Sequence, residues 1–264
     1  MLLITVVAGV AIGLALGGLG GGGSLLTVPV LVYPLGQDVQ TATTAALIIV
    51  GVAALAGMVG HARCGQVRWR IGLTFGVLGA GTAVLGSQLS RSVDPPLLLL
   101  LFAVVMVVAA GAMLRREVAI GDLPSRTRPD PTWPTTPQRS PLATAVRVGV
   151  VALLVGLLTG FFGVGGGFLI VPALVLALAV PLPAAIGTSL LVIVLTCASA
   201  LAERLGAVDI PWGIVVPFAV AGIAGALVGR RLAARLPVRA LSRGFTALLI
   251  GVAGYVGIRA ALDL

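Results

Sequence analysis

The sequence predicts an all-α polytopic membrane protein made of two inverted repeats, each with about four full transmembrane helices plus one short or broken helix. Three observations support this fold class. Hydrophobic residues make up 59% of the chain and charged residues only 9%, a composition far from that of soluble domains. The sequence also repeats itself at a fixed offset. A loop that is rich in arginine in one half corresponds to a loop that is poor in arginine in the other half.

Eight apolar runs are long enough to form helices of about 20 residues, the length that crosses the hydrocarbon core of a bilayer. A signal peptide is the alternative for the first run, but that run lacks a basic beginning and recurs later in the chain. The eight predicted spans are residues 2–19, 41–60, 71–89, 96–114, 142–162, 185–202, 212–229 and 240–258.

An internal repeat relates the two halves of the chain. A shift of 143 residues places GLALGGLGGGGSLLTVP (13–29) over GLLTGFFGVGGGFLIVP (156–172), with 9 identities in 17 positions. The same offset pairs Trp69 with Trp212. Because one offset holds over such a length, the halves are predicted to be homologous.

The chain therefore divides into a first membrane repeat (1–114), a linker (115–141) and a second membrane repeat (142–264), which together form a single membrane domain. The linker carries six prolines from Pro124 onward. Proline interrupts helices and favours extended backbone, so the linker is predicted to be a solvated tether.

Arginine predicts the orientation of each repeat. The loops 63–70, 115–147 and 230–243 are rich in arginine, whereas the loops 90–96 and 203–210 are nearly balanced. By the positive-inside rule the first three are cytoplasmic, together with the linker, and both chain termini lie outside. Repeat-equivalent loops have opposite bias, so the halves are predicted to be inserted in opposite orientations. The expected location is the inner (plasma) membrane.

Inverted insertion requires an odd number of crossings per half, and the missing crossing is predicted at 24–35 and at 167–180. Helices of this length reach only about 18–21 Å at 1.5 Å per residue, less than the roughly 30 Å of hydrocarbon. We therefore expect two broken or half-spanning helices inside the bundle.

The glycines that precede these short helices fall into two groups. Gly13, Gly17, Gly156 and Gly160 have the small-residue spacing of close helix packing, and alanine at Gly13 or Gly156 is expected to be milder than valine at Gly22 or Gly165. Consecutive glycines interrupt a helix instead, and such a break must line a cavity or be buried in protein. The helix that follows each break begins with free N–H groups and the positive end of its dipole, both of which favour binding of an anion at the break. The predicted substrate-binding backbone comprises Gly20, Gly22, Gly23 and Ser24 in the first half, and Gly163, Gly165, Gly166 and Gly167 in the second.

Valine at Gly22 or Gly165 is expected to abolish function by closing the approach and forbidding a positive φ. Four hydroxyl residues follow the breaks in matched positions, Thr43, Thr44, Thr188 and Ser189. They are also predicted to bind substrate, although capping of their own helices is an equal alternative.

Other chemistry has little support in the sequence. All eight acidic residues lie in loops or at span ends, so no intramembrane carboxylate is predicted to relay protons or hold sodium. His61 is predicted at a helix end, as a surface residue. P-loop, HExxH, serine-elbow and redox CxxC motifs do not occur, so no catalytic residue, metal or cofactor is expected and an enzyme is disfavoured. The arginines are explained by membrane topology, and nucleic acid is not an expected partner.

The paired segments GLALGGLGGGGSLLTVP and GFFGVGGGFLIVP, with TATTAALI and GTSLLVI, resemble those of the TauE/SafE family of sulfite exporters, the sulfonate-uptake permease superfamily. The resemblance covers nearly the whole chain outside 115–141. It implies a transporter of sulfite, sulfonates or related small organic anions. The first half departs from the family pattern, because Ala45 follows Thr44 where the family more often has a Thr-Ser pair, as in Thr188 and Ser189.

The function expected from these observations is secondary transport, in the direction of export, of small sulfur-containing anions by alternating access around the two glycine breaks. A non-transporting membrane scaffold or partner subunit, and a carrier for carboxylates, are the alternatives. The expected partners are a small anionic substrate and the lipid bilayer. The particular anion, the direction of transport, the coupling ion and the oligomeric state are left open by the sequence.

Overall fold

The structure is a computed structural model that describes residues 2–32, 34–90, 93, 95–121, 141–162, 167–204 and 210–262. Every regular element in this part of the chain is helical. The elements are α1 (Leu2–Leu19), α2 (Ser24–Val32), α3 (Val39–Arg63), α4 (Trp69–Ser90), α5 (Pro95–Gly121), α6 (Pro141–Phe162), α7 (Gly167–Pro172), the π-helix η1 (Ala173–Ala177), α8 (Leu182–Arg204), α9 (Trp212–Arg235) and α10 (Val238–Leu262).

Each predicted span forms a helix. Five helices are long and apolar enough to cross a membrane within the described residues, α3, α4, α6, α8 and α9. The apolar parts of α1 and α5 are shorter, Leu3–Leu19 and Leu100–Arg115. The all-helical membrane fold is therefore confirmed.

The two predicted short helices are also present. α2 has nine residues, about 14 Å at 1.5 Å per residue. In the second half, α7 has six residues and continues as the five-residue π-helix η1. Pro29 lies inside α2 and its repeat equivalent Pro172 ends α7. Because proline removes an N–H donor and crowds the preceding turn, it disturbs regular helix geometry in both segments.

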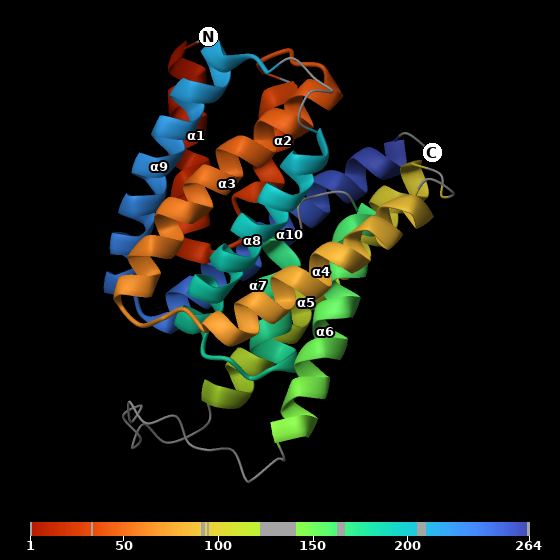
Figure 1. Cartoon of the computed structure of the whole chain (residues 1–264), viewed down its shortest axis with the longest axis vertical. Coiled ribbons are helices and arrows are strands. Elements are labelled where there is room, and N and C mark those ends of the chain that lie inside the picture. Colours follow the sequence, from red (N-terminus) through yellow and green to blue (C-terminus); the bar gives the residue numbers. More distant parts are fainter. Residues whose placement is uncertain are drawn as a thin grey trace.

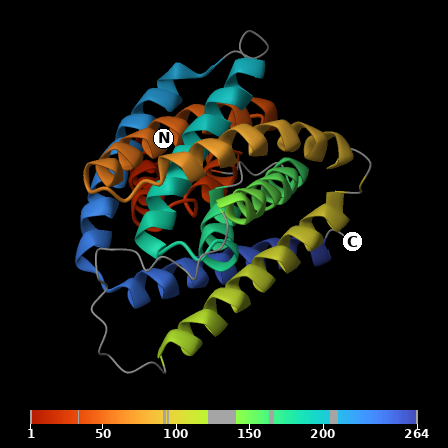
Figure 2. The ribbon, with the colours of Figure 1, turned by 60° about the horizontal axis from the view of Figure 1, so that its bottom comes forward.

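The helices pack in pairs that follow the sequence repeat. α1 lies along α9, and their repeat equivalents α6 and α4 lie along each other (Figure 1). α3 packs against α8 in the middle of the bundle, and α5 packs against α10 (Figure 2). In each of these four pairs, one helix belongs to the first half of the chain and the other to the second half. Insertion of the halves in opposite orientations stays a prediction.

The packing glycines hold the α1–α9 and α4–α6 pairs in direct backbone contact. A Cβ atom at Gly13 would overlap the carbonyl oxygen of Gly222, and one at Gly17 would overlap that of Ala226. Gly156 and Gly160 stand in the same relation to the backbone of α4. The packing interpretation is confirmed. The structure contradicts the expectation that alanine at Gly13 or Gly156 is milder than valine at Gly22, because a Cβ at Gly13 or Gly156 meets backbone that no side-chain rotation can move, whereas one at Gly22 meets the tip of the Leu248 side chain.

The predicted linker is shorter than its sequence bounds. α5 continues through Gly121, seven residues into the segment 115–141, and α6 begins at Pro141. The prolines of the linker begin only at Pro124, so nothing in 115–121 prevents continuation of the helix. Residues 122–140 lie outside the described part of the chain.

Candidate functional site

The two glycine breaks meet inside the bundle. Gly20 ends α1 with φ +84°, in the left-handed region that favours glycine. The backbone of Gly21 then lies against the backbone of Gly167, where α7 begins. Any side chain at Gly21 would overlap the Gly167 carbonyl, so glycine permits the contact. Of the predicted site residues, Gly163, Gly165 and Gly166 lie outside the described residues.

Gly22 and Gly23 serve packing in this structure. A Cβ at Gly22 would meet the tip of the Leu248 side chain on α10, and one at Gly23 would meet the Ile12 carbonyl oxygen on α1. Neither residue has a positive φ; within the described part of the first break only Gly20 does. The argument from positive φ therefore applies to Gly20 and was wrong for Gly22, where valine meets a movable side chain.

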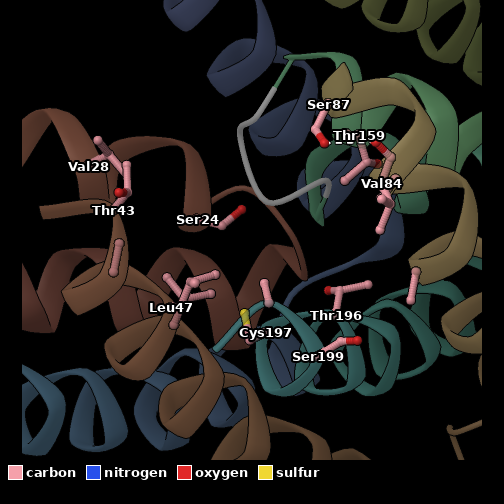
Figure 3. A pocket seen from close by; sticks show the side chains of 16 residues that line it. Ser24, Val28, Thr43, Leu47, Val84, Ser87, Thr159, Thr196, Cys197 and Ser199 are labelled. Carbon is pink, nitrogen blue, oxygen red and sulfur yellow. Dashed lines mark hydrogen bonds between the residues drawn. The ribbon is translucent and has the colours of Figure 1, made fainter. Parts of the chain in front are cut away.

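A cavity of about 250 Å³ lies beside the first break, between α2, α3, α4, α6 and α8 (Figure 3). Both halves of the chain contribute to its wall. Ser24 and Thr43 are the two predicted site residues that line it. Its other polar lining residues were not predicted: Ser87, Thr159, Thr196, Cys197 and Ser199.

The cavity wall is mainly apolar, with a few hydroxyl groups and no charge. Among the described residues that line it, none has a charged side chain. Its hydroxyl groups come from five separate helices, α2, α3, α4, α6 and α8; Figure 3 shows the side chains around the cavity. Ser87 and Ser199 are exposed to solvent, whereas Ser24 is buried, so the cavity opens at the end where α4 and α8 finish.

Five of the six hydroxyl groups of the wall donate to their own backbone. Each bond runs to a carbonyl oxygen three or four residues earlier, at 2.6–3.1 Å. Such bonds are common for serine and threonine inside helices. The residues are Ser24, Thr43, Ser87, Thr159 and Thr196.

The start of α2 forms the part of the wall nearest the break. The Ser24 N–H donates to the Gly21 carbonyl oxygen at 3.3 Å, and the Leu26 N–H donates to that of Gly23 at 3.3 Å. Both distances exceed the usual 2.9–3.0 Å of amide hydrogen bonds, so these bonds are weak. The positive end of the α2 dipole therefore borders the cavity with loosely held donors, which suits a negative group.

The other predicted hydroxyl residues lie outside the cavity. Thr44 is buried and donates to the Gln40 carbonyl oxygen at 3.0 Å. Ser189 donates to the Ile186 carbonyl oxygen at 2.8 Å and is adjacent to Gly20. Thr188 accepts the Arg68 N–H at 3.0 Å and so connects the two halves. In this structure the three residues have packing and connecting contacts instead of a place in the cavity wall.

The opposite end of α3 is closed by a group of contacts that we term the seal. His61 is only 4% exposed; its Nδ1 lies 2.8 Å from Oε1 of Gln66, and its Nε2 lies 3.2 Å from the Gly17 carbonyl oxygen. Arg230 Nη1 donates to the Gly60 carbonyl oxygen at 3.3 Å. The prediction that His61 is a surface residue was wrong, because the end of α1 covers it.

The seal and the cavity occupy equivalent positions in the two repeats. Gly160 and Ser87 line the cavity, and the residues 143 positions away, Gly17 and Arg230, belong to the seal. The same space is thus open in one repeat-related location and filled in the other. No sequence pattern indicated this difference, since it depends on how the helices of the two halves approach one another.

These features define a class of protein. A helical membrane bundle with paired repeats, two broken helices that meet inside it and a one-sided cavity between the halves is typical of membrane transporters. The comparisons with known proteins agree. The sequence matches the family described as "Sulfite exporter TauE/SafE" over residues 5–256, and the chain therefore belongs to this family of membrane transporters, which are not enzymes.

Relatives cover almost the same length. The chain is 37% identical over 266 residues to a "Probable membrane transporter protein" of Xylella fastidiosa strain Temecula1, covering 97% of this chain and 94% of the relative. It is 36% identical to the protein of that name from strain 9a5c, with the same coverage. It is 24% identical to "Probable membrane transporter protein YdhB" of Bacillus subtilis strain 168, over 86% of this chain and 88% of the relative. No solved structure matches the chain.

Proposed function

We propose that the protein is a secondary transporter of small sulfur-containing anions, such as sulfite or organosulfonates, and that the cavity beside the first glycine break is its substrate site. The observation that carries the proposal is the cavity itself, which is mainly apolar, uncharged, provided with hydroxyl groups and bordered by the start of α2. Family membership supports an oxyanion as the substrate. A volume of about 250 Å³ suits a small molecule.

The proposed mechanism is alternating access. The cavity is open where α3 begins, and the seal closes the bundle where α3 ends. Because the seal occupies the repeat equivalent of the cavity, exchange of the two arrangements between the halves would close the first opening and create the other. Such an exchange carries the substrate from one side to the other without a continuous pore.

Efflux from liposomes tests the proposed function. Purified protein is placed in vesicles loaded with labelled sulfite, a labelled organosulfonate or a labelled carboxylate. A transporter of sulfur-containing anions empties the first two kinds of vesicle faster than protein-free vesicles empty. Emptying of the carboxylate vesicles alone would favour the carboxylate carrier, and retention of every anion would favour a non-transporting scaffold.

We further propose that both termini lie outside a bacterial inner membrane and that the seal faces the cytoplasm, as the arginine-rich loops predict. Cys64 tests this orientation because it is a free, exposed cysteine at the seal end of α3. In a variant with Cys197→Ala, a membrane-impermeant thiol reagent is expected to label Cys64 only after the cells are opened. Strong labelling of intact cells would reverse the orientation.

A further inference from the structure

Five of the six hydroxyl groups of the cavity wall donate their proton to the helix backbone, which limits what the wall offers to a substrate. Ser24 donates to the Gly21 carbonyl oxygen at 2.7 Å. Thr159 donates to that of Val155 at 2.6 Å. A serine or threonine hydroxyl has one proton and two lone pairs. Once the proton is bound to the helix backbone, the oxygen presents only lone pairs to a ligand.

Thr196 extends the same pattern to a further wall of the cavity, because its hydroxyl donates to the Ile193 carbonyl oxygen at 3.1 Å. Thr159 on α6 and Thr196 on α8 also line a second, much smaller void between the same helices, so the two residues border a common region. Figure 3 shows them on the side of the cavity away from α2 and Ser24. Opposite the start of α2, Thr159 and Thr196 therefore offer hydrogen-bond acceptors.

A ligand that has only acceptors fits this far wall poorly. To bind Thr159 or Thr196 it must draw the hydroxyl proton away from the backbone carbonyl, so one hydrogen bond is exchanged for another. A ligand that brings its own O–H or N–H group adds a bond and breaks none. The net value of one such bond is a factor of about five in affinity.

We propose, as an extension of the function proposed above, that the site selects sulfonates that carry a hydrogen-bond donor, a hydroxyl or an ammonium group, on their carbon chain. The sulfonate lies beside the start of α2, at the positive end of its dipole. The donor group lies toward Thr159 and Thr196. The site thus recognises both ends of a short molecule.

Two ligands of equal charge and nearly equal size test the selectivity. Hydroxyethanesulfonate ends in a hydroxyl group, and propanesulfonate has a methyl group in its place. Binding to the purified full-length protein in detergent is measured by titration of the melting temperature, which rises when a ligand binds the folded state. We expect hydroxyethanesulfonate to bind about five times more tightly than propanesulfonate.

Substitutions of Thr159 and Thr196 test whether these two residues cause the preference for hydroxyethanesulfonate. Thr159→Val and Thr196→Val keep the shape of the side chain and remove the lone pairs, so the ratio of the two affinities is expected to fall toward one. Thr74→Val is the matched control, because Thr74 makes the same kind of bond to its own helix, to the Arg70 carbonyl oxygen, but is exposed outside the cavity. Its affinity ratio should equal that of the unmodified protein.

The outcomes separate the two proposals. Equal or tighter binding of propanesulfonate by the unmodified protein overturns the donor selectivity and leaves sulfonate transport in place. A preference that survives both Thr159→Val and Thr196→Val in folded protein overturns the assignment to this wall. Absence of binding and of transport for both sulfonates, and for sulfite, overturns the proposed function itself.

Discussion

Replacing Gly17 or Gly160 with alanine is expected to remove most of the folded protein. A Cβ at Gly17 overlaps the Ala226 carbonyl oxygen, and one at Gly160 overlaps that of Ala83. The helices must separate to admit it, and their packing along the whole contact is lost. We expect a destabilisation of about 3 kcal/mol or more, the upper end of what overpacking costs. Size-exclusion profiles and melting temperatures of the purified variants measure it.

Matched controls exist for this prediction. Gly81 in α4 and Gly111 in α5 have no atom within 4 Å of an added Cβ. Alanine is favoured over glycine in helices by up to about 1 kcal/mol, so Gly81→Ala and Gly111→Ala should be neutral or stabilising. If Gly17→Ala is as stable as Gly81→Ala, the direct backbone contact between α1 and α9 is contradicted.

Filling the cavity is expected to abolish transport and leave the fold intact. Ala200 lines the cavity on α8 and is partly exposed, so Ala200→Phe places a ring in the space that the substrate needs. Val84→Trp does the same from α4, where Val84 is 43% exposed. Efflux of labelled sulfite or sulfonate from liposomes should fall to the level of protein-free vesicles.

The control for the cavity variants is Ala198→Phe, two residues away on α8. Ala198 is exposed and does not line the cavity. This variant should transport at the normal rate, because its ring points away from the substrate space. Normal efflux through folded Ala200→Phe and Val84→Trp would show that the substrate takes another route.

The sequence predicted the helices well because their signal is local. A bilayer requires about 20 apolar residues for each crossing, and such runs are visible without knowledge of the fold. The short helices were predicted from glycine and proline, which interrupt helices for local reasons. α5 was predicted too short by seven residues because Arg115 and Arg116 were taken to start the linker, whereas arginine is a good helix former.

The cavity was less predictable because it depends on contacts between distant segments. Ser24 and Thr43 were found, but Thr159 and Thr196 are single hydroxyl residues in apolar helices, and such residues often bond only to their own backbone. His61 was misplaced for a related reason. Its position near the end of α3 suggested exposure, and only the approach of Gly17 from α1 shows that it is buried.

The pairing of α1 with α9 has a consequence for the synthesis of the protein. α1 ends at Leu19, and α9 begins at Trp212. At roughly 5–20 residues per second, a ribosome needs on the order of 10–40 seconds to make the chain between them. Throughout this interval the face of α1 that contains Gly13 and Gly17 lacks its main neighbour. Although α1 is made before α9, it is therefore among the last helices to be completed as a packed element, and a chain truncated before α9 leaves that glycine face open to lipid or to membrane proteases.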